Sequence, residues 1–369
     1  IQNIRIIFAT GQTWKQQRRF GLMTLRNLGL GKKGFEHRIQ EEARHLVEYF
    51  MNEQGTPLDP TFPIVHAVAN VISAVVFGHR FSIDDEGIFV CLSQLYNIFP
   101  SLMDHLPGPH NAIFACHEFI REFAGKEIRI HEENGTPEKP EDFIDFYLAQ
   151  IAKCKDDPNS TFDEDNLVQC ISDLFFAGTE TTTTTLHWAL LYMVVHQDIQ
   201  EKVQKELDAV LEPSQLICYE DRKRLPYTNA VIHEIQRYSN IVAVGAMRTN
   251  VTGTTLLGFP LQKGTNIISN LPSVLLDPEQ WETPRKFNPN HFLDKDGNFV
   301  TREAFLPFGA GQRVCLGEQL ARTELFIFFS NLLRAFSFRL PEGRKEINTE
   351  PQLGGMLKPH PYKLCAVPR

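Results

Sequence analysis

The sequence has no long hydrophobic run and no paired cysteine motif. Its longest apolar stretch, Leu186–Val195, is interrupted by His187 and is far shorter than the about 18 residues that a membrane-spanning helix needs. The seven cysteines are odd in number, widely scattered and form no CxxC pair, which excludes a disulfide framework and a four-ligand zinc site. We therefore expect a chain that spans no bilayer and is intracellular or faces the cytosol.

The sequence also lacks the positive charge of a general nucleic-acid-binding protein, because its formal net charge is −8. Hydrophobic residues make up 42% of the chain, which excludes disordered, collagen-like and coiled-coil proteins. A length of 369 residues is compatible with one large core. Residues 1–35 contain no aspartate or glutamate but carry a group of cations: Arg5, Lys15, Arg18, Arg19, Arg26, Lys32 and Lys33.

Apolar residues recur at spacings of three and four over most of the first 240 residues, which predicts helices joined by proline-containing segments. These helices are expected at Lys15–Leu28, Gly34–Asn52, Ile64–Phe77, Ile113–Glu133, Asp142–Lys153, Ile199–Leu211 and Tyr227–Arg237. The longest periodic stretch runs from about Asp163 to Gln197. At about 1.5 Å per residue it would be about 50 Å long, so we expect this helix to cross the core.

After Asn240, glycines separate short β-type runs. We expect strands at Val242–Arg248, Thr254–Phe259 and Thr265–Ser269, which would form one small sheet. A proline-rich irregular stretch, a glycine turn, a helix from Leu316 to about Phe336 and a hairpin bending at Gly354-Gly355 would follow. The fold is therefore expected to be mainly α and a single domain, with a helical part (1–240), a β region with an irregular stretch (241–307) and a C-terminal part (308–369).

The glycine turn, residues 308–317, contains the most informative cysteine of the chain. Gly309 and Gly311 permit backbone angles that other residues avoid and let the turn approach a bulky partner. The turn places Cys315 before a helix start, where unpaired N–H groups and the helix dipole favour a thiolate, and Arg313 adds positive charge. From these residues alone, Cys315 could be a nucleophile, a redox thiol, a metal ligand or a buried small residue.

The turn matches every fixed position of the pattern F-G-x-G-x-R-x-C-x-G, and the sequence thereby resembles the haem-thiolate monooxygenases of the cytochrome P450 family. The resemblance implies the haem-domain fold of this family and haem b (iron protoporphyrin IX) as the cofactor. It implies that Cys315 is the axial iron ligand, whose electron donation favours O–O cleavage. It also implies that Arg313 pairs with a haem propionate and that Phe308 packs beside the thiolate, in a loop shaped by Gly309, Gly311 and Gly317.

A second motif lies inside the long predicted helix, where Ala177-Gly178-Thr179-Glu180-Thr181-Thr182 matches the family pattern A/G-G-x-D/E-T-T/S. Glycine at mid-helix costs about 1 kcal/mol relative to alanine, and room beside the iron would compensate for it. The Thr181 hydroxyl can bond to a carbonyl one turn earlier and bend the helix. The resemblance implies that Thr181 delivers protons during oxygen activation and that Glu180 supports it. Taken alone, the motif would fit a threonine-rich helix face with a solvated glutamate.

A third motif, Trp14-x-x-x-Arg18, places an indole N–H and a guanidinium on one helix face, where both can reach one carboxylate. By resemblance these two residues and Arg248 hold the haem propionates. The nearby cations Lys15, Arg19, Arg26, Lys32 and Lys33 suggest docking of an acidic electron donor, expected from the family to be NADPH-cytochrome P450 reductase or cytochrome b5. An ordinary solvated basic face is an equal alternative.

Glu234-x-x-Arg237 is the E-x-x-R motif of the family, and its residues share a helix face where acid and base can pair. Many relatives complete this network with P-E-R-F, whereas this sequence has Pro289-Asn290-His291-Phe292. With His291 in place of the arginine, the network carries less charge. We assign Glu234, Arg237 and His291 to fold integrity rather than to chemistry.

Three longer stretches, 173–181, 229–234 and 317–322, resemble microsomal family two, and most closely its J subfamily. The resemblance implies a location on the cytosolic face of the endoplasmic reticulum membrane. It implies epoxidation or hydroxylation of polyunsaturated fatty acids and oxidation of lipophilic drugs. By position, the substrate pocket would include Phe176, Ala177, Thr181, Ala243, Val244 and Met247, although relatives usually have proline where this chain has Ala243 and Met247.

Relative to the family, the sequence begins at the third major helix, so we expect it to lack the membrane anchor, the first helices and the first strands. The region Phe81–Leu95 also looks a helix shorter. Two alternatives to a monooxygenase follow: a truncated product that binds haem or partners without catalysis, and a haem-thiolate isomerase. The intact Glu180-Thr181 pair disfavours the isomerase.

Overall fold

The computed structural model describes residues 6–7, 9–29, 33–81, 110–135, 137, 139–344 and 346–369. Apart from Phe81, the region 81–95 lies outside the described residues, as do Arg5 and Lys32. Helices make up most of the described chain: α1 (Gly11–Asn27), α2 (Lys33–Asn52), α3 (Thr61–Val76), α5 (His110–Asn134), α6 (Phe143–Lys153), α7 (Glu164–Val195), α8 (Gln197–Val210), α9 (Pro226–Ser239), α10 (Pro272–Leu275) and α11 (Glu318–Ala335). The expected mainly α fold is confirmed.

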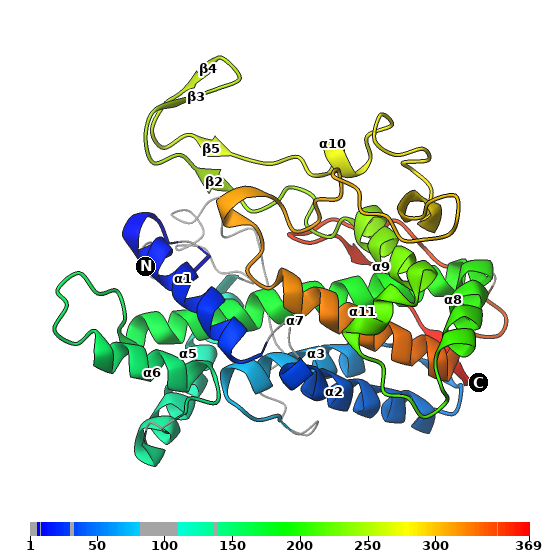
Figure 1. Ribbon diagram of the computed structural model, residues 1–369, viewed down its shortest axis with the longest axis horizontal. Helices are drawn as coiled ribbons and strands as arrows, with labels where there is room; N and C mark the ends of the chain where they lie inside the picture. Colours follow the sequence, from blue (N-terminus) through cyan, green and yellow to red (C-terminus); the bar gives the residue numbers. More distant parts are fainter. Residues whose placement is uncertain are drawn as a thin grey trace.

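Helix α7 is 32 residues long and runs through the middle of the molecule, with α11 alongside it (Figure 1). Its N-terminus is fixed by Asp163, whose side chain accepts a hydrogen bond from the backbone N–H of Asn166 at 2.7 Å. The prediction that this stretch crosses the core is confirmed. None of the helices that the structure describes is both long and apolar enough to cross a membrane.

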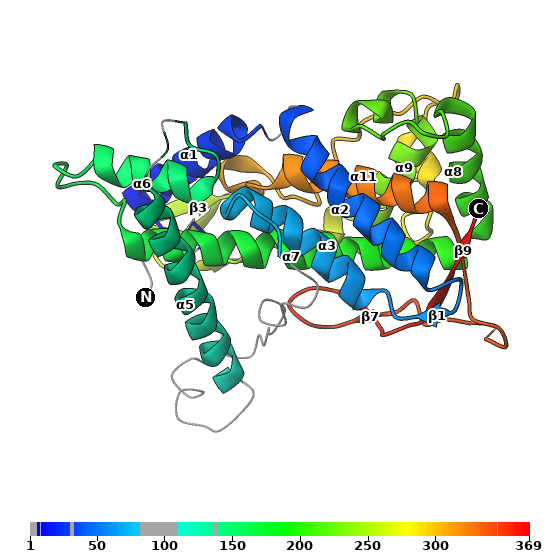
Figure 2. The same cartoon turned by 90° about the horizontal axis from the view of Figure 1, so that it is seen from below.

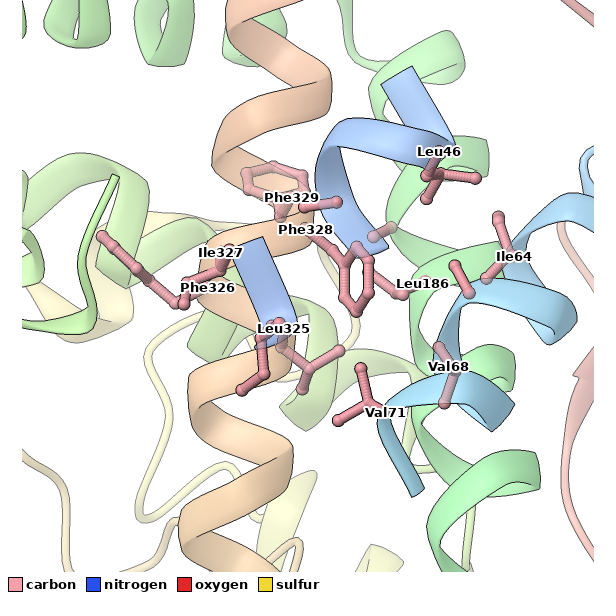
Figure 3. Close-up of a cluster of buried hydrophobic side chains, with 14 of the residues drawn as sticks. Leu46, Ile64, Val68, Val71, Leu186, Leu325, Phe326, Ile327, Phe328 and Phe329 are labelled. Atoms are coloured by element: carbon pink, nitrogen blue, oxygen red, sulfur yellow. The ribbon is translucent and has the colours of Figure 1, made fainter. Parts of the chain in front are cut away.

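The hydrophobic core lies where α2, α3, α7 and α11 pack against one another. Figure 3 shows part of this core, with Leu325–Phe329 on α11, Ile64, Val68 and Val71 on α3, and Leu186 on α7. These side chains are almost fully removed from water. Burial of each large apolar side chain contributes about 1.5–3 kcal/mol, so this cluster fixes α7 relative to the helix that follows the Cys315 turn.

A three-stranded antiparallel sheet, β1 (Pro57–Leu58), β9 (Leu364–Pro368) and β6 (Phe336–Arg339), joins distant parts of the chain. It lies at the end of α3 (Figure 2). The sequence does not predict this sheet, because a two-residue strand has no alternation to detect. The helix expected to run to about Phe336 ends at Ala335, and β6 begins at Phe336. The predicted hairpin around Gly354-Gly355 is confirmed as β7 (Pro351–Gln352) paired with β8 (Lys358–Pro359).

The predicted single small sheet after Asn240 is wrong in its details. The strands are shorter and form two separate pairs: β2 (Arg248–Thr249) with β5 (Asn266–Ile267), and β3 (Thr254–Leu256) with β4 (Phe259–Leu261). Residues 242–247 form a turn and an irregular segment rather than a strand, because Asn240 ends α9 in a left-handed conformation and Gly245, at φ 57°, closes a turn onto Val242. The β3–β4 hairpin stands away from the helices (Figure 1).

Candidate active site

The Cys315 turn is shaped by two glycines in the left-handed region, Gly309 at φ 73° and Gly311 at φ 77°. The backbone N–H of Cys315 donates to the carbonyl of Phe308 at 3.0 Å and so closes the loop. Helix α11 begins three residues later, with Gly317 at its N-cap position. Taken as a whole residue, Cys315 is exposed. The sequence therefore predicted the position of this cysteine before a helix correctly.

The expected thiolate character of Cys315 is not supplied by the protein alone. Although the residue is exposed, the surrounding protein desolvates the thiol and raises its pKa above the ordinary value, and the carboxylate of Glu318 adds to this. The N–H groups of Gly317 and Glu318 act in the opposite direction, as does the charge of Arg18. Arg18 is thus the cation that lowers the pKa of this thiol, an effect that the sequence led us to expect from Arg313. A bound metal cation would act in the same direction as these N–H groups and favour the thiolate.

Three arginines from distant segments meet beside the Cys315 turn. Arg18 donates to the carbonyl of Val314 at 2.7 Å, and Arg248 donates to the carbonyl of Arg313 at 3.1 Å. Desolvation lowers the pKa of all three guanidinium groups, and their mutual repulsion lowers the pKa values of Arg18 and Arg313 further. In the part of the chain that the structure describes, no carboxylate forms an ion pair with any of them.

Trp14 packs against two members of this arginine cluster. The guanidinium of Arg313 lies 4.1 Å from the centroid of the Trp14 ring, and Arg313 also donates to the carbonyl of Ala9 at 2.7 Å. Arg18 lies 5.9 Å from the same ring, one turn further along α1. The W-x-x-x-R spacing therefore places both side chains on one face of α1, as predicted. The guanidinium of Arg322 lies 4.9 Å from the ring centroid of Phe308.

The middle of α7 is partly exposed, whereas the stretches on either side of it are buried. Residues 166–171 and 182–186 are buried, whereas none of the residues 174–181 is. Phe176 is 45% exposed, and Ala177 is exposed beside it. The hydroxyl of Thr181 donates to the carbonyl of Ala177 at 2.7 Å. This is the predicted bond to a carbonyl one turn earlier in the helix.

The expected reason for Gly178 is corrected by the structure. A Cβ atom at Gly178 would lie 2.4 Å from Cδ1 of Ile72, so the space beside this glycine is filled by α3. The glycine therefore serves the close packing of α3 against α7 rather than leaving room in that direction. The alternative of a solvated Glu180 is also corrected, because its carboxylate is only partly exposed and forms an ion pair with Lys358 of β8.

The remaining predicted pocket residues lie in the turn after α9. Val244 and Met247 are each 59% exposed, and the carbonyl of Ala243 accepts a hydrogen bond from the N–H of Leu271 at 3.1 Å. Among the described residues, no hydrogen bond joins this turn to Phe176 or Thr181.

Glu234, Arg237 and His291 form one fully buried network. Arg237 donates two hydrogen bonds of 2.7 Å to the Glu234 carboxylate and further bonds to three backbone carbonyls. The backbone N–H of Thr283 donates to Nε2 of His291, so Nδ1 carries the proton and donates to Glu234 at 3.2 Å. His291 is therefore a neutral partner, in keeping with the lower charge predicted for this network.

Two contacts at the site escaped the sequence analysis: the ion pair of Lys358 with Glu180 and the packing of Ile72 on Gly178. Each joins residues that are far apart in the sequence. No local pattern marks either Lys358 or Ile72, so only the fold reveals them.

The residues of the site fit a haem. An exposed cysteine, a cluster of unneutralised guanidinium groups and a partly exposed helix segment are the features that a flat apolar ring with two carboxylates and a metal would use. The protein-family model described as Cytochrome P450 matches residues 1–366, and the chain belongs to this family. It is therefore a haem-thiolate monooxygenase, an enzyme that uses haem b with a cysteine thiolate ligand, electrons from a redox-partner reductase, dioxygen and an organic substrate.

Within the family, the chain is similar to members of the 2J group. Human Cytochrome P450 2J2 is 47% identical over 378 residues, which cover 99% of this chain and 75% of that protein. Cytochrome P450 2J3 of Rattus norvegicus is also 47% identical over 378 residues, with the same coverage. Cytochrome P450 2D28 of Mesocricetus auratus is 41% identical over 379 residues, covering 99% of this chain and 76% of that protein.

Proposed function

We propose that this monooxygenase acts on lipophilic substrates, by epoxidation or hydroxylation of polyunsaturated fatty acids and by oxidation of drug-like molecules. Cys315 is the iron ligand in this proposal, and Arg18, Arg248, Arg313 and Trp14 hold the propionates. The observation that carries it is the placement of an exposed cysteine beside three guanidinium groups that have no carboxylate partner among the described residues. The apolar, half-exposed Phe176 on α7 supports a lipophilic substrate.

The bound haem would supply oxygen activation and insertion of one oxygen atom into the substrate. The chain's own residues would bind, orient and move protons. Phe176 and Ala177, together with the turn that contains Ala243, Val244 and Met247, would contact the substrate. Thr181 would hold a proton on Oγ1, and its bond to the carbonyl of Ala177 keeps that hydroxyl in a fixed position. Glu180, paired with Lys358, would support proton supply as an anion.

We further propose that an acidic electron donor docks on the exposed side of α1. A groove of about 480 Å³ there is lined by Trp14, Lys15, Arg18, Arg19, Leu22, Met23, Arg26 and Gln312. Most of its polar side chains are cations, which would steer an acidic protein. NADPH-cytochrome P450 reductase and cytochrome b5 are the expected donors. By similarity to its relatives, we place the protein at the cytosolic face of the endoplasmic reticulum membrane.

The test of the cysteine role is the difference spectrum of the reduced protein with carbon monoxide. We expect the strongly red-shifted Soret band of thiolate ligation in the haem-loaded protein and its loss in Cys315→Ser. Cys154→Ser, which changes a partly buried cysteine at the C-cap of α6, is the matched control and should keep the band. A shifted band that survives in Cys315→Ser contradicts the assignment.

The substrate class is tested separately, by incubating the haem-loaded protein with reductase, NADPH and a long polyunsaturated fatty acid. Epoxide or hydroxylated products that require both NADPH and dioxygen support the proposal. Turnover of small polar molecules with no oxidation of the fatty acid contradicts it. Product formation from a fatty-acid peroxide in the absence of NADPH would instead indicate the isomerase alternative.

A further inference from the structure

Arg322 is a partly buried cation that the proposed function does not use. It lies in the first half of α11, the helix that follows the Cys315 turn, and its side chain is 21% exposed. Its Nε and Nη2 atoms each lie 3.0 Å from Oε1 of Glu318, one turn earlier in the same helix. Its guanidinium lies 4.9 Å from the ring centroid of Phe308 and 5.5 Å from that of Phe305. Arg322 therefore contacts the chain both before and after Cys315.

Both contacts bear on the surroundings of the Cys315 sulfur. The carbonyl of Phe308 accepts the backbone N–H of Cys315 at 3.0 Å, so the position of Phe308 is tied to that of the cysteine. The carboxylate of Glu318 raises the pKa of the Cys315 thiol, because a nearby anion disfavours the thiolate. A guanidinium that lies against the Phe308 ring restrains this ring, and its charge offsets that of Glu318.

A histidine from another helix holds Arg322 in this place. Nδ1 of His233, on α9, lies 2.8 Å from the carbonyl of Asn229, and a carbonyl can only accept, so Nδ1 carries the proton. Nε2 therefore accepts a hydrogen bond from Nη1 of Arg322 at 3.0 Å. Desolvation lowers the pKa of His233 to about 3, and the charge of Arg322 acts in the same direction, so the ring is neutral at pH 7. The ring centroid lies within 5.4 Å of those of three phenylalanines: Phe292, Phe299 and Phe305.

We propose that Arg322 is a positioning residue for the iron ligand: it restrains Phe308 before Cys315 and neutralises Glu318 after it, while neutral His233 fixes the guanidinium. The proposal rests on the assignment of Cys315 as the iron ligand. In the part of the chain that the structure describes, Glu318 has no other ion-pair partner. Loss of Arg322 would thus leave an uncompensated anion beside the sulfur.

The charge is tested by the reduction potential of the haem-loaded protein. Uncompensated negative charge near a metal stabilises its oxidised form, so we expect Arg322→Met to shift the potential to more negative values. Glu318→Gln leaves the cation uncompensated and should shift the potential in the opposite direction. The double variant Arg322→Met/Glu318→Gln removes both charges and should return it close to the value of the unmodified protein. Equal potentials in all four proteins overturn the charge role.

The contacts are tested by the stability of the shifted Soret band in the carbon monoxide difference spectrum. Arg322→Lys keeps the charge but loses the planar group that reaches His233 and Phe308 together. We expect its band to convert to the normal Soret position several-fold faster in mild urea, before circular dichroism reports loss of helix. His233→Phe, which keeps an aromatic ring without an acceptor, should act in the same way, and His233→Gln, whose carbonyl can accept, should recover part of the stability. Conversion at the unmodified rate in Arg322→Lys and His233→Phe overturns the positioning role.

Arg302→Met is the matched control. Arg302 also pairs with a carboxylate, that of Glu282 at 3.3 Å, and lies 5.3 Å from the ring centroid of Trp281, but none of its described contacts is with the Cys315 turn. This variant should keep both the potential and the band. If the unmodified protein shows the shifted band and Arg322→Met equals it in potential and band stability, the positioning role is wrong and the ligand assignment stands. If the unmodified protein lacks the shifted band, the ligand assignment itself is wrong, and the proposal fails with it.

Discussion

Single residues at this site are explained by partners that lie far away in the sequence. Gly178 belongs to a motif that the sequence reveals, but the reason for the glycine is Ile72 on another helix. Likewise, the charge of Glu180 is balanced by Lys358 near the other end of the chain. Local patterns such as F-G-x-G-x-R-x-C-x-G reveal residues whose chemistry depends on neighbours in the sequence. They do not reveal pairings that exist only after the helices have packed.

The contact of Gly178 with Ile72 gives a prediction at this scale. In Gly178→Ala the added methyl group must displace a buried, β-branched side chain, and overpacking of this kind costs about 1–3 kcal/mol. Alanine recovers about 1 kcal/mol of helix propensity, so we expect a net loss of unfolding free energy near the lower end of that range. Urea denaturation measures it.

The second variant in this test is Ile72→Val, which removes the Cδ1 atom that the new Cβ would approach most closely. The double variant should be more stable than the sum of the two single effects predicts. Strict additivity would contradict the packing explanation.

At the scale of elements, the sequence predicted the helices well and the strands poorly. The expected stretch Asp163–Gln197 differs from α7 by one residue at its start and two at its end, because a long period of 3.6 residues and a capping aspartate leave little ambiguity. The strands are two to five residues long and are held by partners from remote segments, as in the pairing of Pro57 with Cys365. Such short elements are created by the packing of helices around them.

One joint between elements is predicted to depend on pH. His131 of α5 contacts Asp142, the N-cap residue of α6, at 2.8 Å, and this hydrogen bond raises the pKa of His131 to about 9. The ring also contacts the backbone carbonyl of Glu127, and the nearby carboxylate of Asp145 favours the charged form. Because the folded pKa is raised, this contribution to stability is fully present below about pH 6.5 and is lost as the pH rises through about 9.

The measurement is the urea midpoint of unfolding between neutral pH and pH 10. We expect the midpoint of the unmodified protein to decline over this range more steeply than that of His131→Gln, which cannot carry the charge. His37→Gln is the control, because His37 is exposed and bonds only to the carbonyl of Gly34 among its described contacts. Equal slopes for all three proteins would show that the His131–Asp142 contact does not hold α5 to α6.

At the scale of the whole molecule, one buried arginine on α9 links the irregular stretch after α10 to the helices through hydrogen bonds. Arg237 bonds the carbonyls of Leu275, Pro284 and Lys286 in addition to Glu234. Arg237→Ala would leave the Glu234 carboxylate buried with a neutral histidine as its side-chain partner, and breaking a buried pair in this way costs about 3–5 kcal/mol. We expect a large loss of folded protein, which circular dichroism and the urea midpoint would measure.

The companion variant Glu234→Gln/Arg237→Met removes both charges together and should recover much of that loss, because no charge then remains unpaired. If it is no more stable than Arg237→Ala, the three carbonyl contacts matter more than the ion pair.

The three-stranded sheet sets an order of events during synthesis. Its middle strand, β9, pairs with β1 on one side and with β6 on the other, and β1 emerges from the ribosome long before β9 does. The edge of β1 must therefore wait, unpaired, while the intervening helices are made, and the sheet closes only after Leu364–Pro368 has left the exit tunnel. A chain released before that point would leave both β1 and β6 without the strand that they share as a partner.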